Sequence, residues 1–292
     1  MLDFRIHTFL CVCRHMNYTK AAAELHITQP AVSQHIRYLE KEYKAKLFDY
    51  TGKRLMLTQA GNILLNAAAT IRHDDSMLKK RITDLQRSNL SISLGATHTI
   101  GEFGIADRLG NFLREHQNLN LRLAIADTDQ LLVMVDEGQI DFAIVEGFFE
   151  QCKYDTLLFA DEPIVGVCGP DYPIDDVKGW NDVLDKRIII REKGAGSREL
   201  LERHLAEHNL TIDDFPYRAE VGSPQAIKGL AARNCGIAFL YETSITEDIA
   251  NGKLRLVPIR GFSVRHAFTF LWRKGSMYSQ VFKDMYKELQ KQ

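Results

Sequence analysis

The sequence predicts an α/β protein built from an N-terminal winged helix-turn-helix, a long linker helix and a two-lobed α/β domain. Three observations predict this order. Two short helices joined by a tight turn lie within the first 42 residues, one apolar seam runs through residues 58–87, and apolar strands alternate with helices from residue 91 onward. The expected divisions are 1–58, 59–88 and 89–292, with lobe 1 at about 89–161 and 266–292 and lobe 2 at about 162–265.

The first 26 residues are expected to contain two helices. Residues 3–16 form the first, and its apolar side consists of Phe4, Phe9, Val12 and Cys13. Residues 20–25 form the second, with Thr19 as its N-cap. Three consecutive alanines at 21–23 leave room there for another helix to cross closely.

The next helix is predicted to begin after Thr28, whose hydroxyl suits an N-cap, with Pro30 in the first turn. Its apolar edge consists of Ala31, Val32, Ile36 and Leu39. Its polar side consists of Gln29, Ser33, Gln34 and Arg37. Amides, hydroxyls and a guanidinium suit base edges and phosphates, so the pair is typical of a helix-turn-helix that binds DNA. An ordinary helical hairpin inside an all-helical domain is the alternative.

Residues 46–58 are expected to form a small β-hairpin, because two short apolar segments flank a turn containing Thr51 and Gly52. Such a hairpin after a helix-turn-helix is a wing, and Lys53 and Arg54 at its tip would reach the phosphate backbone. Residues 1–60 carry nine Lys/Arg against five Asp/Glu, a balance of +4, whereas the whole chain is at −1. The basic end is therefore where an anionic polymer would bind.

Three blocks of sequence resemble the N-terminal domain of LysR-type transcriptional regulators. They are AAAELHITQPAVSQHIRYLE at 21–40, Leu47-Phe48, and Leu57-Thr58-Gln59-Ala60-Gly61. The remaining chain has the length and layout of that family's effector domain. The predicted DNA contacts are Lys20, Thr28, Gln29, Pro30, Ser33, Gln34, Arg37, Tyr50, Lys53 and Arg54. Tyr50 stands where the family usually has Arg, and Ala45 where it favours Gly, so the wing is expected to hold DNA less tightly.

Residues 58–87 are predicted to form one long helix capped by Thr58. An apolar seam with a seven-residue repeat consists of Leu64, Ile71, Leu78 and Leu85, flanked by Ala60, Ala67, Ala68 and Ile82 and interrupted by Asp74, Asp75 and Arg81. A helix of this length with one seam predicts pairing with a second copy of the chain. The alternative is an amphipathic helix packed on its own domain. The family resemblance implies dimers that pair again into tetramers.

From Ser91 onward the pattern favours a parallel α/β sheet covered on both faces. The expected strands are 91–96, 121–126, 141–145, 164–169, 187–191, 217–221, 236–240, 254–259 and 266–272, and the expected helices include 103–115, 128–137 and 199–208. The chain is expected to cross between two lobes at 161–163 and to return at 261–265, as in periplasmic-type binding proteins, an arrangement that the resemblance also implies. Ligands in such folds bind between the lobes, at strand C-termini and helix N-termini.

The candidate ligand-binding residues follow from that rule. They are Thr97, His98, Thr99, Thr128, Glu146, Gly196, Ser197 and Ser223, each just after a predicted strand or at a helix start. Hydroxyls and free N–H groups there suit a small anion, although a plain N-cap is the alternative for each. Glu146 favours a ligand that also carries an amine or a hydroxyl, unless it pairs with Arg198 or Lys228.

The sequence offers little support for catalysis, a metal or a membrane. It contains no nucleophile elbow, P-loop, dinucleotide fingerprint or zinc-protease motif, and the pair His204 and His208 has no third ligand nearby in sequence, so neither an enzyme nor a metal site is expected. No apolar run is long enough for a membrane span. No signal peptide is expected, because the charged residues Asp3 and Arg5 lead directly into the first predicted helix. Five scattered cysteines favour a reducing cytoplasm over a disulfide framework.

The prediction is therefore a bacterial cytoplasmic regulator that binds double-stranded DNA as a homodimer or homotetramer and responds to a small anionic effector, without a cofactor. RNA polymerase is a further candidate partner. Two alternatives stay open: a redox-sensing regulator that uses Cys152, Cys168 or Cys235, and a small-molecule-binding protein or enzyme that does not regulate transcription.

Overall fold

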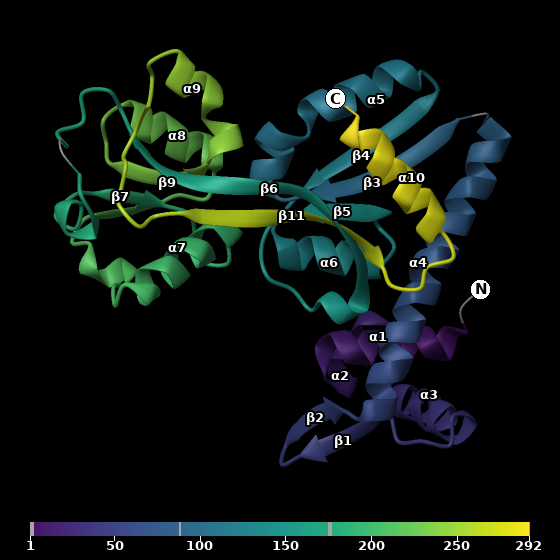
Figure 1. Ribbon diagram of the computed structural model, residues 1–292. Helices are drawn as coiled ribbons and strands as arrows, with labels where there is room; N and C mark the ends of the chain where they lie inside the picture. Colours follow the sequence, from purple (N-terminus) through teal and green to yellow (C-terminus); the bar gives the residue numbers. More distant parts are fainter. Residues whose placement is uncertain (1–2, 88, 175–176, 292) are drawn as a thin grey trace.

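The computed structural model describes residues 3–87, 89–174 and 177–291 (Figure 1). A helical head at the N-terminus stands on one long helix, which leads to two lobes joined by a pair of long strands. The head contains α1 (Phe4–His15), α2 (Tyr18–Glu24), α3 (Gln29–Glu42), β1 (Phe48–Thr51) and β2 (Arg54–Leu57). The three helices and the hairpin confirm the predicted winged helix-turn-helix.

The head is held by one apolar core in which α1 packs against both other helices. Phe9 and Val12 are fully buried, as predicted, but Phe4 is 58% exposed and the remaining core positions are Ile6, Leu10 and Cys11. The expected cap Thr19 is also wrong, because α2 begins one residue before it and the Asn17 side chain accepts from the Lys20 N–H at 2.9 Å. Asparagine is among the strongest N-caps, so the earlier start is favoured.

The long helix α4 (Gln59–Arg87) begins where predicted, and Thr58 caps it by accepting from the Gly61 N–H at 3.0 Å. Gly61 allows α4 to cross the head closely, since a Cβ there would lie 2.1 Å from the Leu47 carbonyl oxygen. The glycine of the Leu-Thr-x-Ala-Gly block is therefore required by packing.

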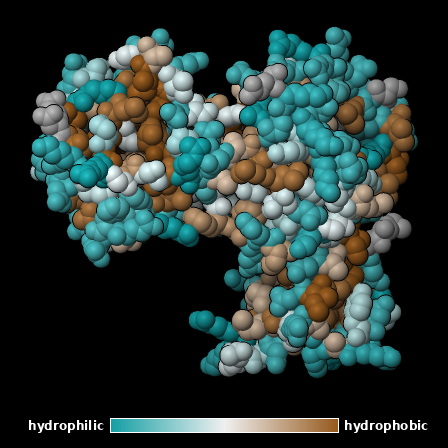
Figure 2. All heavy atoms as spheres, viewed as in Figure 1, coloured by the Kyte–Doolittle hydropathy of each residue, from teal (hydrophilic) through white to brown (hydrophobic). Residues whose placement is uncertain are grey.

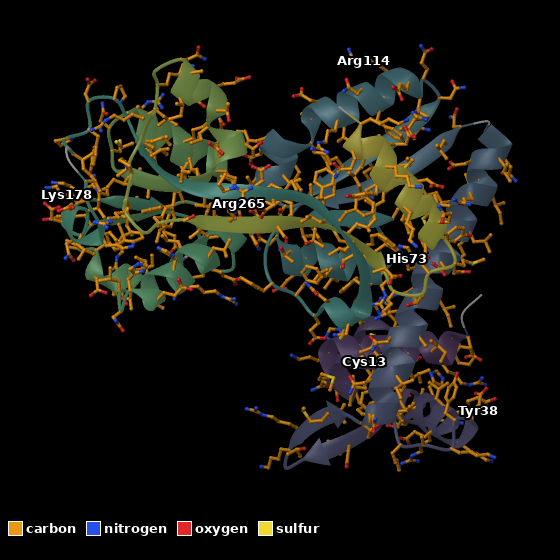
Figure 3. All side chains as sticks on the ribbon, viewed as in Figure 1. Cys13, Tyr38, His73, Arg114, Lys178 and Arg265 are labelled. Atoms are coloured by element: carbon orange, nitrogen blue, oxygen red, sulfur yellow. The ribbon has the colours of Figure 1, made fainter. Side chains whose placement is uncertain are left out.

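Two sides of α4 have different environments. One side is bound to lobe 1: His73 is fully buried with its Nε2 2.9 Å from the Asp141 carbonyl, and the Ser76 hydroxyl donates to the Gly138 carbonyl at 2.7 Å (Figure 3 labels His73). Another side leaves Ile71, Leu78, Ile82 and Leu85 more than 45% exposed. The helix therefore packs on its own domain, and its exposed apolar seam keeps pairing with a second copy as a prediction.

Within the described residues, the C-terminal part contains one sheet of nine strands in the order β4-β3-β5-β11-β6-β9-β7-β8, with β10 paired to β6. The strands are β3 (Leu90–Ala96), β4 (Leu119–Ile125), β5 (Phe142–Val145), β6 (Tyr154–Cys168), β7 (Ile188–Ile190), β8 (Arg218–Glu220), β9 (Ile237–Tyr241), β10 (Arg255–Leu256) and β11 (Val264–Arg273). The helices are η1 (Ile100–Gly104), α5 (Ala106–Glu115), α6 (Thr128–Asp136), η2 (Gln151–Lys153), η3 (Trp180–Asp182), α7 (Gly196–Glu207), η4 (Ile212–Asp214), α8 (Pro224–Ala232), η5 (Glu242–Ser244), α9 (Thr246–Ala250) and α10 (Ser279–Gln290).

The expectation of an all-parallel sheet is wrong in the middle of the molecule. The pairs β3–β4, β3–β5, β7–β8 and β7–β9 are parallel, but β6 and β11 run antiparallel to each other and to their neighbours. These two long strands pass from one lobe to the other side by side (Figure 1). The chain therefore crosses within continuous strands. Residues 161–163 lie inside β6, opposite residues 265–267 of β11.

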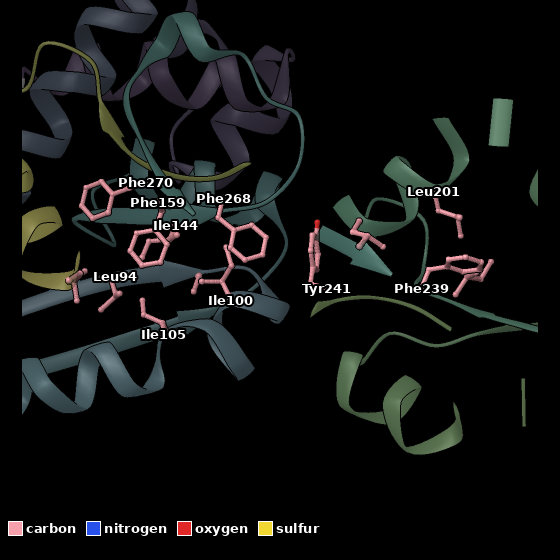
Figure 4. Packing of buried hydrophobic residues seen from close by; sticks show 14 of the residues in the cluster. Leu94, Ile100, Ile105, Ile144, Phe159, Leu201, Phe239, Tyr241, Phe268 and Phe270 are labelled. Carbon is pink, nitrogen blue, oxygen red and sulfur yellow. The ribbon is translucent and has the colours of Figure 1, made fainter. Parts of the chain in front are cut away.

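Each lobe has its own packed interior on either side of this crossing. In Figure 4, Leu94, Ile105 and Phe270 lie in one lobe and Leu201 and Phe239 in the other, with Tyr241 near the gap between the two groups. Among the helices of the described ranges, none has the length and apolar character needed to cross a membrane.

Candidate DNA-binding surface and interlobe site

The recognition helix α3 presents one buried and one exposed side. Val32, Ile36 and Leu39 are at most 2% exposed, which fixes the orientation of the helix on the head. Thr28 caps it as predicted, accepting from the Ala31 N–H at 3.4 Å, and Pro30 lies in its first turn. The predicted contact residues Gln29, Gln34 and Arg37 are exposed and Ser33 is half-buried.

The recognition helix and the wing together form a concave polar surface. A hollow of about 380 Å³ is lined by both elements and brings Ser33 and Arg37 of α3 beside Tyr50 of β1. Lys53 and Arg54 lie exposed at the wing turn, where Gly52 adopts φ +64°, and Lys20 is exposed on α2. Donors from α2, α3 and the wing can therefore meet one duplex, the helix in its major groove and the wing on its backbone.

Part of the polar side of α3 is preorganised before DNA arrives. The Gln29 amide donates to the Ser33 hydroxyl at 3.0 Å, one helical turn away. The Arg5 guanidinium lies 3.8 Å from the centre of the Tyr38 ring, which holds the outer end of the helix to α1. These contacts restrict the rotamers of side chains on or beside the exposed polar side of α3, which would lower the entropy lost on binding a partner there.

Between the lobes, polar residues from both sides form a buried group. We call Thr97, Thr99, Glu146, Arg191 and Tyr241 the interlobe cluster; each is at most 4% exposed. Thr97 and Thr99 follow β3, Glu146 follows β5, Arg191 follows β7, and Tyr241 ends β9. Three members were predicted from the rule that ligands meet strand C-termini. The same rule should have found Arg191 and Tyr241, which end strands of lobe 2.

Glu146 is central to this cluster. Its N–H donates to the Thr97 hydroxyl at 3.4 Å, and its carbonyl accepts from the Thr128 hydroxyl. Burial raises the pKa of its carboxyl, against the effect of hydrogen bonds from Tyr241, Thr99 and Thr97 and of the Arg191 charge. The alternative that it pairs with Arg198 or Lys228 is wrong, because Arg198 pairs with Glu202 and Glu220, and Lys228 pairs with Asp248.

Two further contacts fix members of the interlobe cluster. Arg191 is clamped by the adjacent Glu192, with Nε to Oε2 at 2.8 Å and Nη2 to Oε1 at 2.6 Å. The Tyr241 hydroxyl lies 3.0 Å from Nδ1 of His266 on β11. Burial lowers the pKa of His266, so the neutral imidazole is favoured there.

The other predicted ligand residues lie at three places: the start of α7, the lobe 1 residues Thr128 and His98, and the start of α8. Gly196 and Ser197 are buried at the start of α7, and a Cβ on Gly196 would lie 3.2 Å from the Gly147 Cα across the lobes. Thr128 is held by the Glu146 carbonyl, and His98 lies within 4.0 Å of Glu102 and Asp127. Ser223 caps α8 by accepting from Ala226, which is its N-cap alternative.

Two further groups of side chains bear on redox chemistry and metal binding: the three candidate redox cysteines, and a cluster of possible metal ligands in the head. Cys152 is exposed, Cys235 half-buried and Cys168 buried, and burial raises the pKa of the Cys168 thiol, which disfavours the reactive thiolate. Ligand atoms of Cys11, His15 and Glu24 lie within 4.8 Å of one another. Glu24 already accepts from Arg14 at 2.7 Å and lies 2.5 Å from the His15 ring, so this group ties α1 to α2.

Comparison with known proteins gives the family. The LysR substrate binding domain matches residues 86–292, and the bacterial regulatory helix-turn-helix protein, lysR family, matches residues 5–62. A RuBisCO operon transcriptional regulator of Acidithiobacillus ferrooxidans is 31% identical over 277 residues, covering 94% of this chain and 89% of that protein.

Solved structures agree on the fold. The regulatory domain of Synechocystis PCC6803 CcmR in complex with 2-PG matches with TM-score 0.61 and 22% identity, covering 68% of this chain and 95% of that one. Full-length LysG from Corynebacterium glutamicum with bound effector Arg matches with TM-score 0.63 and 14% identity, covering 99% and 98%. Since one family domain matches more than half of the chain and the other matches its head, this protein belongs to the LysR family and is a DNA-binding transcriptional regulator.

Proposed function

We propose that the protein reads operator DNA through Gln29, Ser33, Gln34 and Arg37 of α3, while Lys20, Tyr50, Lys53 and Arg54 hold the phosphate backbone. The observation that carries this proposal is the concave surface shared by α3 and the wing, in which the polar side of α3 is exposed and its apolar side is buried. Thr28 and Pro30 set the start of the helix rather than reading bases.

The regulator acts as a homodimer paired through α4. Ile63, Ile71 and Leu85 are 66%, 52% and 82% exposed, and an almost wholly apolar groove of about 350 Å³ is lined by Ile63 and Ile71. Apolar residues come to the surface on this stalk in Figure 2. An exposed apolar seam on a helix of this length is best covered by a second copy of the same helix. Two recognition helices then read two half-sites.

The effector is a small acid bound between the lobes, at the interlobe cluster and the start of α7. α7 has no side-chain cap, because its N-cap residue is Ala195, so its first N–H groups favour an anion. The related folds of CcmR and LysG carry 2-PG and Arg respectively, so the fold accommodates different small molecules and the residues between the lobes must select among them.

Opening or closing the lobes changes the spacing of the two heads and hence the contact with operator DNA and RNA polymerase. The function is regulatory rather than catalytic, and it is exerted on the chromosome in the cytoplasm. The redox alternative needs an accessible low-pKa thiol, and the direction of the Cys168 pKa is opposite to that requirement.

The test is a gel shift with DNA upstream of the protein's own gene and, because a 31% identical relative regulates a RuBisCO operon, with any RuBisCO promoter of the same genome. Wild type and Gln34→Ala/Arg37→Ala are compared at two salt concentrations. We expect specific retardation of the wild type that the double variant loses by at least about tenfold. Retardation that depends on neither sequence nor variant would refute the proposed reading surface.

A further inference from the structure

One carboxylate oxygen between the lobes has no partner. Oε2 of Glu146 is buried and accepts no hydrogen bond from any residue that the structure describes. A buried carboxylate oxygen loses its water and regains nothing unless a donor replaces it. The side chain is only 3% exposed, and it lies where β5 of lobe 1 meets Arg191 and Tyr241 of lobe 2.

The charges around it do not fill this gap. Arg191 supplies the guanidinium of the cluster, but its Nε and Nη2 both donate to the carboxylate of Glu192. Glu102 on η1 adds another buried and unpartnered carboxylate oxygen among the described residues, and His98 beside it faces Asp127 as well. Although Tyr241, Thr99 and Thr97 act on the Glu146 carboxyl, its Oε2 and the Oε2 of Glu102 both lack a donor among the described residues.

A donor from outside the chain satisfies this arrangement. The start of α7, with its uncapped N–H groups, lies against Gly147, the residue directly after Glu146. An anion-binding helix start and a donor-seeking carboxylate are thus neighbours across the lobe boundary. A ligand that fits both has an acid group at one end and a hydrogen-bond donor close to it.

We propose that Glu146 is the specificity-determining residue of the effector site, and that it selects small acids that also carry an ammonium or a hydroxyl group. The inference rests on the proposed interlobe location of the effector. The donor binds Oε2 of Glu146 and the acid group binds at Gly196 and Ser197. Acids without a donor leave the carboxylate unsatisfied and add a like charge beside it, so they bind more weakly.

The test measures binding of matched acids to the full-length protein by calorimetry. Alanine and lactate carry the donor that propionate lacks, and phosphoserine and 3-phosphoglycerate carry the donor that 3-phosphonooxypropanoate lacks. We expect at least one donor-bearing acid to bind the wild type at least about tenfold more tightly than its donor-free counterpart. Glu146→Gln should reduce this preference to about threefold or less, because a neutral amide accepts a hydrogen bond more weakly.

The control is Glu150→Gln, the same change at an exposed carboxylate of lobe 1, which should leave the preference intact. Donor-free acids that bind the wild type as tightly as their counterparts would overturn the inference, and this comparison does not depend on the folding of the variant. Equal preference in wild type and Glu146→Gln would also overturn it. Failure of all six acids to bind at about 10 mM would count against it too. Absence of specific operator retardation by the wild type in the gel shift would instead refute the proposed function.

Discussion

At the scale of single residues, Tyr50 is the proposed phosphate contact of the wing strands that carries no charge. The side chain is 64% exposed on β1 beside Ser33 and Arg37 of the recognition helix, and it carries no charge. Tyr50→Arg should add one phosphate contact, raise operator affinity several-fold at low salt and steepen the salt dependence by about 0.9 per decade.

The measurement is a fluorescence titration with operator DNA at four salt concentrations. Tyr50→Phe is the matched control, because it keeps the ring and removes only the hydroxyl. A slope in the Arg variant equal to that of the wild type would mean that this side chain does not reach the backbone.

Glu146 also predicts a pH dependence of stability. Burial raises the pKa of its carboxyl above the ordinary value of 4.5, so the folded state binds its proton more tightly than the unfolded state does. Its contribution to stability is therefore present below pH 4.5 and is lost as pH rises through the folded pKa. Glu146→Gln lacks this loss. The free energy of unfolding of the wild type relative to this variant should fall as pH rises above 4.5, measured by urea titration; a pH-independent difference would contradict it.

The residue scale also marks how far sequence could identify the interlobe site. The positions Thr97, Thr99 and Glu146 were predicted because each directly follows an apolar strand. Tyr241, the last residue of β9, directly follows the predicted strand 236–240 and so meets the same rule, but the prediction did not include it. The partner of Glu146 was mistaken because the local pairings of Arg198 and Lys228 depend on tertiary packing, which charge patterns along the chain do not reveal.

At the scale of elements, the exposed seam of α4 predicts self-association. Ile71→Glu places a charge at the centre of the seam. Burying an unpaired carboxylate in an apolar interface costs about 3 kcal/mol or more. The dimer should therefore dissociate to a monomer at micromolar concentration. Light scattering after size exclusion measures the mass. Thr83→Glu adds the same charge to the same helix outside the seam and should stay dimeric. Two variants with equal masses would argue against pairing through α4.

The junction between α4 and lobe 1 makes a second prediction at this scale. Arg273 at the end of β11 is 1% exposed; its Nη1 lies 2.8 Å from Asp136 Oδ1 and its Nη2 donates to the Asn66 carbonyl on α4 at 3.0 Å. Arg273→Met should lower the free energy of unfolding by about 3 kcal/mol. The change leaves Asp136 without the guanidinium that pairs with it and removes the hydrogen bond to the Asn66 carbonyl of α4. Chemical denaturation checks this, with exposed Lys274→Met as the control expected to change less than about 0.5 kcal/mol.

Comparing the predicted elements with the observed ones shows which structural features local sequence patterns can predict. The head and α4 were predicted closely because caps, Pro30 and a seven-residue repeat are local signals. The parallel sheet was overextended because an apolar strand in β6 or β11 has the same composition whichever way its neighbour runs. Residues 161–163 were expected to carry the crossing between the lobes. They lie inside β6, where Asp161 is paired with Arg265 of β11 at 2.6 Å, so the chain passes there as a continuous strand (Figure 3 labels Arg265).

At the scale of the whole molecule, the head, α4 and lobe 1 are fastened together, whereas lobe 2 is attached mainly through β6 and β11. Arg14 of α1 forms an ion pair with Glu137 beside α6, and the Arg72 Nη2 donates to the Asp136 carbonyl at 2.8 Å. His73 and Ser76 continue the attachment along α4. Lobe 2 is therefore the part expected to move when an effector binds, with the crossing strands as its hinge.

This arrangement predicts the effect of a wedge between the lobes. A side chain at Gly196 would meet the Gly147 backbone nitrogen and Cα at 3.2 Å and the Glu146 carbonyl carbon at 3.3 Å, all of them backbone atoms that cannot turn aside. Gly196→Val should therefore hold the lobes apart. Because the head and α4 are fastened to lobe 1, the variant should bind operator DNA within about threefold of the wild type and yet give no change in its footprint when an effector is added. Footprinting on operator DNA with and without a bound acid measures both quantities. Gly110→Val is the control, since a Cβ there meets no atom within 4 Å, and it should respond to the effector like the wild type. An unchanged effector response in Gly196→Val would mean that closure at α7 is not the step that links the effector to DNA.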